Sequence, residues 1–272
     1  YPLKVKTGNT WKKHIYIPMV KPLEFEFKEV PIDPYLLGVL LGDGGLSDAG
    51  RAITFSGLDL EIVELIQPSL EKLGAKLEKV SESIKHPDYR IKSFEKYKHT
   101  QLRPALKSLG ILGAKSNNKF IPDVYKYNSK EVRLAILQGL IDTDGYCPGS
   151  SYEFVSVSKQ LAEDVKFLCE SLGLTATIVE KQPMFTYKEE YKKGQIAYRL
   201  RIKTSTEISK IHKSSLKGKN WKQGQSSARR TIDEIIKTSE FVEMTCISTT
   251  NPNKLFVTEG CVVTHNTFSF VT

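Results

Sequence analysis

Two short stretches of the sequence decide the fold: LLGVLLGDG at residues 36–44 and LQGLIDTDG at residues 137–145. The first is apolar at nearly every position, which predicts a helix buried on all sides. Both end in Asp-Gly, and glycine suits the left-handed position that follows a helix. A glycine inside a helix costs about 1 kcal/mol relative to alanine. Gly38 and Gly139, at matching places, therefore indicate two helices whose backbones approach closely.

The surroundings of the two stretches repeat as well. An amphipathic helix is expected over residues 59–73, with a kink at Pro68, and a similar helix is expected at 158–172. Each half also carries two strand-like runs, at 52–55 and 76–80 in the first and at 152–157 and 175–179 in the second. We therefore predict a tandem duplication with halves of about 30–125 and 126–230, paired through the two apolar helices.

Composition sets broad limits on what the chain can be. Of the 272 residues 40% are hydrophobic and 26% charged, which excludes disorder for most of the chain. No apolar run approaches the roughly 18 residues of a membrane span, so no membrane partner is expected. The four cysteines Cys147, Cys169, Cys246 and Cys261 form no CxxC pair. Structural zinc and a disulfide framework are therefore disfavoured, and a reducing cytoplasm is the expected location.

The net charge of +9 suggests a polyanionic partner, nucleic acid first. Residues 208–232 contain seven Lys or Arg and no Asp or Glu. This stretch is either a solvated basic loop or a segment that follows a phosphate backbone, whose affinity would fall steeply with salt. The candidate DNA-binding residues are Lys210, Lys217, Lys219, Lys222, Arg229 and Arg230.

The two Asp-Gly ends carry the expected chemistry. Asp43 and Asp144 come at the negative end of a helix dipole, where a carboxylate needs a compensating cation. Two such helices side by side bring the carboxylates together, and like charges at close range require a metal or a proton. Hard oxygen ligands favour Mg²⁺. Mg²⁺ beside a basic surface suggests phosphodiester hydrolysis.

Both stretches resemble the LAGLIDADG motif of the dodecapeptide (DOD-type) homing endonucleases, in the two-motif single-chain form. The resemblance implies an α+β fold over residues 26–235, a monomer of two αββαββα halves whose antiparallel sheets form a saddle over the DNA major groove. It also implies that the eighth-position acids, Asp43 and Asp144, bind Mg²⁺, with Gly42 and Thr143 counted in the metal site, and that each serves one strand of a double-strand break.

Two lysines extend the resemblance. KFIP at residues 119–122 resembles the family's Lys-x-Ile-Pro block, whose lysine lies near an active site. Lys213, in HKSS at 212–215, is similar in placement to the lysine of the second half. Lys119 and Lys213 would stabilise charge on the phosphate or orient a water. The alternative is that both are ordinary surface lysines.

The C-terminal region resembles the splicing blocks of an intein. Two strand-like runs within 236–266 end in VVTHNT at residues 262–267. By this resemblance Asn266 attacks its own carbonyl to form a succinimide, and His265 polarises that carbonyl or protonates the leaving amine. Thr267 would be the acyl acceptor, opening a downstream host segment at 267–272, and Cys246 falls where an assisting residue is often found.

The N-terminal region, residues 1–25, resembles later strands of the same all-β splicing (Hint) domain. It departs from the family because a first Cys or Ser nucleophile and a Thr-x-x-His block are both missing. We expect this block to be truncated or supplied by a separate N-terminal intein fragment. Full splicing by this chain alone is not expected, whereas cleavage at Asn266 without splicing stays open.

Two alternative functions stay open. One is a DNA- or RNA-binding protein, such as a maturase or a regulator, that keeps the fold without cutting; retention of both Asp43 and Asp144 argues against it. The other is a splicing-only intein whose endonuclease has decayed into a DNA-binding domain. Gly42 and the looser first motif leave that second alternative open.

Overall fold

The computed structural model describes most of the chain between residues 4 and 265. The described residues are 4–7, 10–13, 16–47, 52–81, 87–95, 99–147, 149, 151–187, 190–204, 206–211, 229–232, 234, 236, 239, 243 and 247–265. Among the helices in these ranges, none combines the length and apolar character that a membrane span requires. The side chains of Cys147, Cys169 and Cys261 are buried and form no disulfide within the described residues, and Cys246 lies outside those residues.

The first half follows the order αββαββα. Its elements are α1 (Pro34–Gly42), β4 (Gly44–Gly45), β5 (Thr54–Phe55), α2 (Leu60–Lys72), β6 (Ala75–Lys79), β7 (Tyr89–Ser93) and α3 (Leu102–Ser108). The four strands form one antiparallel sheet in the order β4-β5-β7-β6. Helix α2 continues through Pro68 as a single element.

The second half repeats the order αββαββ after the short helix α4 (Asp123–Lys126), and within the described residues no helix equivalent to α3 follows it. Its elements are α5 (Lys130–Asp144), β8 (Gly145–Tyr146), β9 (Ser151–Ser156), α6 (Lys159–Ser171), β10 (Thr175–Lys181) and β13 (Ala197–Lys203). The antiparallel sheet has the order β8-β9-β13-β10, which is equivalent strand for strand to the first. The predicted tandem duplication of antiparallel α+β units is thereby confirmed.

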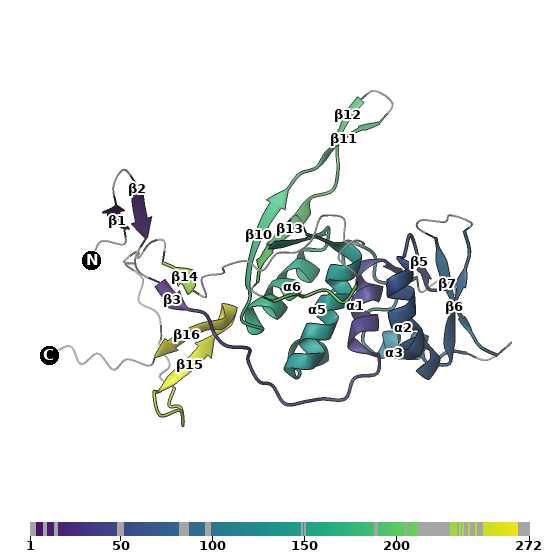
Figure 1. Ribbon diagram of the computed structural model, residues 1–272, viewed down its shortest axis with the longest axis horizontal. Coiled ribbons are helices and arrows are strands. Elements are labelled where there is room, and N and C mark those ends of the chain that lie inside the picture. Colours follow the sequence, from purple (N-terminus) through teal and green to yellow (C-terminus); the bar gives the residue numbers. More distant parts are fainter. Residues whose placement is uncertain are drawn as a thin grey trace.

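The two halves meet through α1 and α5, which lie side by side at the centre of the molecule (Figure 1). A Cβ atom on Gly38 would lie 3.0 Å from the Cα of Gly139, and one on Gly139 would lie 2.8 Å from the amide nitrogen of Val39. The helices therefore touch backbone to backbone, as the glycines predicted. Both helices contribute to one hydrophobic core that continues into both halves.

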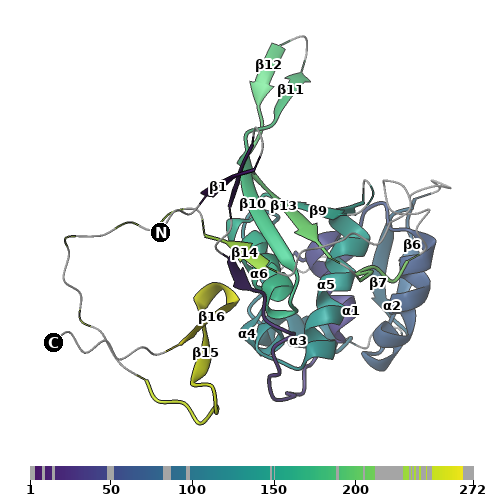
Figure 2. The same ribbon diagram turned by 60° about the vertical axis from the view of Figure 1, so that its left-hand side comes forward.

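A β-hairpin extends from the second sheet. Strands β11 (Met184–Tyr187) and β12 (Glu190–Lys193) pair with each other beyond the far ends of β10 and β13. Figures 1 and 2 show this hairpin projecting well away from the helices. The sequence analysis did not anticipate it.

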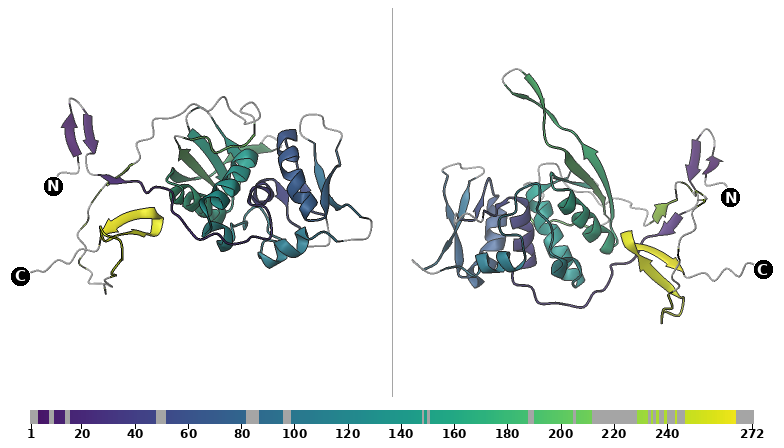
Figure 3. Two further views of the ribbon diagram at one scale, coloured as in Figure 1. Left: turned by 60° about the horizontal axis from the view of Figure 1, so that its bottom comes forward. Right: turned by 180° about the vertical axis from the view of Figure 1, so that it is seen from behind.

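Strands from the two ends of the chain gather on one side of the molecule (Figures 1 and 3). Strand β1 (Lys4–Thr7) pairs with β2 (Thr10–Lys13), and β15 (Leu255–Thr258) pairs with β16 (Val262–His265) through the short helix η1 (Glu259–Cys261). Strand β3 (Tyr16–Pro18) pairs with β14 (Arg229–Thr231) and contacts β16. Strand β14, which falls in the range expected for the endonuclease, thus associates with the N-terminal strands.

The segment from residue 19 to residue 33 fastens these strands to the helices. The Leu23 amide donates to the Ser171 carbonyl at the end of α6 (2.8 Å). The Asn128 side chain accepts from the Lys28 amide (3.1 Å) and donates to the Lys28 carbonyl (2.9 Å). The buried Arg133 guanidinium donates to Leu23 and Ser171 carbonyls. Because its backbone is hydrogen-bonded at several points, this connection is fixed to the helices. We call residues 19–33 the strap.

The contact between the glycines is open to a direct test. We expect Gly139→Ala to lower the free energy of unfolding by about 2–3 kcal/mol, because the added methyl group meets main-chain atoms of α1 that cannot rotate away. Urea unfolding followed by circular dichroism measures the change. Gln138→Ala on the same helix is the control and should shift stability by no more than about 0.5 kcal/mol. Equal stability of Gly139→Ala and the parent would contradict the close contact.

Candidate active site

Asp43 and Asp144 lie at the neighbouring C-terminal ends of helices α1 and α5. Asp33 starts α1 by accepting a hydrogen bond from the Leu36 amide (3.0 Å), with Pro34 in the first turn. Asp43 is the C-cap of α1, and Asp144 is the last residue of α5. A Cβ atom on Gly42 would lie 3.4 Å from Oδ2 of Asp144, so the two helix ends touch. The Asp144 side chain is exposed and that of Asp43 is half-buried.

Gly42 is required by this contact between helix ends. A Cβ atom there would lie 2.8 Å from the Cβ of Thr143 and closer still to its hydroxyl oxygen. Gly42 makes the first motif differ from the family pattern. The close packing of the two helix ends explains why a glycine occupies this position. The Thr143 hydroxyl donates to the Gly139 carbonyl (2.9 Å) and the Leu140 carbonyl (3.1 Å) of its own helix.

Lys119 reaches into the C-terminal end of α1 from the segment that joins the halves. Its Nζ donates to the carbonyl oxygens of Gly42 (2.8 Å) and Gly44 (2.9 Å). The residue is only 6% exposed, so the interpretation of Lys119 as a surface lysine is wrong. Burial lowers the pKa of its ammonium group, while the nearby carboxylates of Asp144 and Asp43 oppose that shift. Lys119 thus supplies positive charge where the helix dipole and two acids place negative charge.

A pocket of about 230 Å³ opens beside these groups. It lies between the helix ends and the end of β9, and its lining includes Gly42, Lys119, Asp144 and Ser156. The volume is sufficient for a phosphate group or several waters.

The oxygen donors at the helix ends fit a divalent cation. Two carboxylates and the terminal carbonyl groups of two helices are hard ligands of the kind that Mg²⁺ prefers. Within the described ranges, no group of three or more His, Cys, Asp or Glu side chains is arranged to hold a metal. Mg²⁺ usually keeps several waters or phosphate oxygens in its coordination shell, so two carboxylates suffice. Asp43 and Asp144 would hold the ion.

Asp142 is a buried polar centre that the sequence analysis missed. Its carboxylate accepts hydrogen bonds from the Tyr35 hydroxyl (2.8 Å), the Ser209 hydroxyl (2.5 Å) and the Lys210 amide (3.0 Å). Burial raises the pKa of Asp142, and these donors oppose the shift. The signal was an acid at the sixth motif position, where the first copy has Leu41. Asp142 ties the chain after β13 to both central helices.

Of the other predicted DNA-binding and splicing residues, some lie among the described residues and others do not. Lys210 is exposed, with its Nζ 4.4 Å from the centre of the Tyr35 ring. Arg230 forms an ion pair with the buried Glu170 on α6 (2.9 Å). His265 is exposed at the end of β16. Outside the described residues, or with side chains outside them, are Lys213, Lys217, Lys219, Lys222, Arg229, Cys246, Asn266 and Thr267.

The Asp142 centre leads to a stability prediction. Asp142→Ala should lower the free energy of unfolding by about 2–3 kcal/mol, because it leaves the Tyr35 hydroxyl and the Lys210 amide without their acceptor. Tyr35→Phe removes one hydrogen bond and should cost about 1 kcal/mol. Chemical denaturation measures both. Glu64→Ala, an exposed acid on α2, is the control. An Asp142→Ala variant as stable as this control would show that the centre contributes nothing.

Part of the chain is similar to a known domain family, and longer stretches are similar to curated proteins. Residues 131–217 match the model of the LAGLIDADG-like domain. The replicative DNA helicase DnaB of Mycobacterium intracellulare is 26% identical over 251 residues, or 90% of this chain and 37% of the helicase. The ATP-dependent DNA helicase Hel308 of Thermococcus kodakarensis is 29% identical over 187 residues, or 63% of this chain and 15% of that protein. The chain thus spans well under two thirds of these curated relatives.

The fold is also similar to those of several solved structures. A mesophilic variant of the homing endonuclease I-DmoI gives a TM-score of 0.45 at 16% identity, covering 68% of this chain and 95% of that chain. I-DmoI in complex with DNA and Ca gives 0.44 at 15% identity over the same shares. Full-length DUF199/WhiA from Thermatoga maritima gives 0.39 at 14% identity, covering 64% of this chain and 51% of that chain. By sequence, residues 131–217 are thus similar to a LAGLIDADG-like domain, and this stretch includes Asp144 and all of α5 except its first residue.

Proposed function

We propose that this chain is a Mg²⁺-dependent, site-specific DNA endonuclease carried within an intein. The observation that supports the nuclease proposal is that Asp43 and Asp144 lie at adjoining helix ends, beside the buried ammonium group of Lys119. Both acids come from one chain, so we propose that a monomer cuts both strands.

The chemistry follows from the charges at this site. Mg²⁺, when bound, supplies neutralisation of the phosphate and a more acidic bound water. Asp43 and Asp144 would hold the divalent cation beside the DNA backbone, and each carboxylate would serve one strand. Lys119 is buried and would place a positive charge near the phosphate, where electrostatic stabilisation is stronger than in water. The basic residues after β13 would add sequence-independent attraction to DNA.

The comparisons support an inserted element. The family match includes the second motif helix and the sheet that follows it. The relatives have different names, a replicative helicase, Hel308 and a small subunit of replication factor C, yet each matches over a minor share of its length. A similar segment within such different proteins is what a mobile insertion would produce.

The arrangement of the end strands supports the intein part of the proposal. Strands β15 and β16 form the hairpin expected to precede Asn266, with His265 as its last residue. Strand β3 from the N-terminal region lies against β16 and β14. The strap from residue 19 to residue 33 then leads from these strands to the nuclease helices. We propose that Asn266 cyclises and that the free amine of Thr267 leaves.

The nuclease proposal is tested on DNA duplexes that have been selected for binding to this protein. Duplexes selected over successive rounds for binding are cloned into supercoiled plasmids and incubated with Mg²⁺ or with EDTA. We expect linear product with Mg²⁺, and nicked circles from Asp43→Asn and from Asp144→Asn, because each change removes one carboxylate that serves one strand. A loss of at least about 100-fold in cutting of that strand is expected.

Glu64→Gln, which changes an exposed acid on α2, should cut like the parent. Salt-sensitive binding without any Mg²⁺-dependent cutting would instead indicate a decayed nuclease. Linear product from both aspartate variants at parental rates would exclude these residues from the reaction.

The splicing chemistry is tested without DNA. With a carrier protein fused after Thr272, we expect slow release of the carrier by cleavage between Asn266 and Thr267. The upstream fragment should be lighter by one water than a hydrolysis product, because the Asn266 side chain closes a succinimide. Mass spectrometry distinguishes these two products. Asn266→Ala should abolish release, and His265→Ala should slow it. Release that is unaffected by Asn266→Ala would rule out this mechanism.

A further inference from the structure

The position of Lys119 depends on a segment that has no regular structure of its own. Residues 119–122 lie outside helices and strands, between α3 and α4. The lysine nevertheless places its Nζ against two carbonyl groups at the end of α1. The main chain at Lys119 must therefore be held by contacts with another part of the structure.

Helix α6 supplies that support through two buried side chains. The Ser158 hydroxyl donates to the Lys119 carbonyl (2.6 Å) and accepts from the Leu161 amide (3.2 Å), so it is both the N-cap of α6 and a clamp on the segment. The Asp164 carboxylate accepts from the Ile121 amide (2.8 Å). Ser158 is fully buried and Asp164 is 3% exposed.

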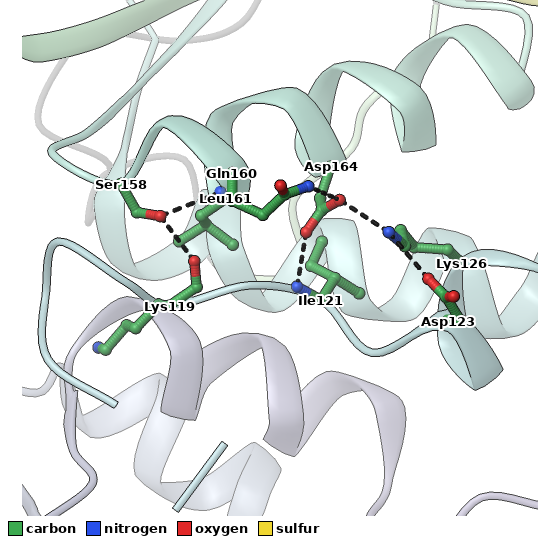
Figure 4. A network of polar contacts seen from close by, with 8 residues as sticks. All are labelled: Lys119, Ile121, Asp123, Lys126, Ser158, Gln160, Leu161 and Asp164. Atoms are coloured by element: carbon green, nitrogen blue, oxygen red, sulfur yellow. Dashed lines mark hydrogen bonds and ion pairs between the residues drawn. The ribbon is translucent and has the colours of Figure 1, made fainter. Parts of the chain in front are cut away.

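Asp164 is itself held in place by two further donors. Its Oδ1 accepts from Lys126 Nζ (2.9 Å) and Gln160 Nε2 (3.0 Å). Lys126 also pairs with Asp123 (3.0 Å), so α4 closes the network. Figure 4 shows this chain of contacts, with the Lys119 side chain pointing away from Ser158 and α6. The clamp belongs to the second half, whereas the lysine acts at the helix end of the first.

The first half has different residues at the equivalent places. Ser158 aligns with Asp59, which is the N-cap residue of α2 but makes no side-chain capping bond. Asp164 aligns with Leu65, which is exposed. The clamp is thus a property of α6, and an effect confined to one DNA strand is the expected sign of its loss.

We propose that Ser158 and Asp164 are positioning residues, which hold Lys119 in register for cleavage of one DNA strand. This inference rests on the proposed nuclease function. A displacement of about 1 Å in a reacting group can cost about 100-fold in rate. Loss of the clamp should therefore slow one strand without weakening DNA binding.

The test compares Ser158→Ala, Ser158→Thr, Asp164→Asn and Lys119→Ala on duplexes labelled on either strand. Ser158→Ala and Asp164→Asn should slow the Lys119-dependent strand by about tenfold or more, with the dissociation constant for DNA unchanged within about twofold. Ser158→Thr keeps the hydroxyl and should restore the rate. Adding Ser158→Ala to Lys119→Ala should cause no further loss, since both act through one group. Glu163→Gln, on the exposed face of α6, is the control.

A second readout does not need cleavage. Lys119 should resist acetylation by a water-soluble reagent in the parent chain and in Ser158→Thr, and become reactive in Ser158→Ala and Asp164→Asn. Equal slowing of both strands, or full additivity with Lys119→Ala, would overturn the proposal. Unchanged acetylation in folded clamp variants, as judged by thermal melting, would do the same. A parent that shows the acetylation pattern but cuts no DNA would contradict the nuclease alone.

Discussion

The backbone contact between α1 and α5 at Gly38 and Gly139 is the constraint on which the rest of the structure depends. Because no side chain separates the helices there, each fixes the height and rotation of the other. Their ends must then meet, which places Asp43 and Asp144 at one edge. Larger residues at either glycine would separate the helices and, with them, the acids.

This arrangement concentrates negative charge at the ends of α1 and α5. Two helix dipoles direct their negative ends at the same region, and each ends in a carboxylate. Lys119 offsets part of this charge by bonding to carbonyl groups at the end of α1. The remainder makes the region suited to a divalent cation. The same feature therefore accounts for the buried lysine and for the proposed metal site.

The duplicated α+β order followed from repeating motifs, and the close helix pair from matching glycines. Lys119 was identified as a candidate, but its burial was not, since the carbonyl groups around it come from the end of α1 and the start of β4, 75–79 residues earlier. Ser158 was expected only as the first residue of a helix. Its second bond, to Lys119, depends on how the halves dock. Asp142 was passed over because its donors Tyr35 and Ser209 are distant in sequence.

The placement of the metal tests the central claim most directly. Crystals of the chain with a selected DNA duplex and Mn²⁺ would locate the ion by its anomalous scattering. The account predicts density in contact with the carboxylates of Asp43 and Asp144, next to the DNA backbone and within reach of Lys119. DNA bound across the sheets with Mn²⁺ elsewhere, or with no ion between these acids and the phosphates, would contradict it.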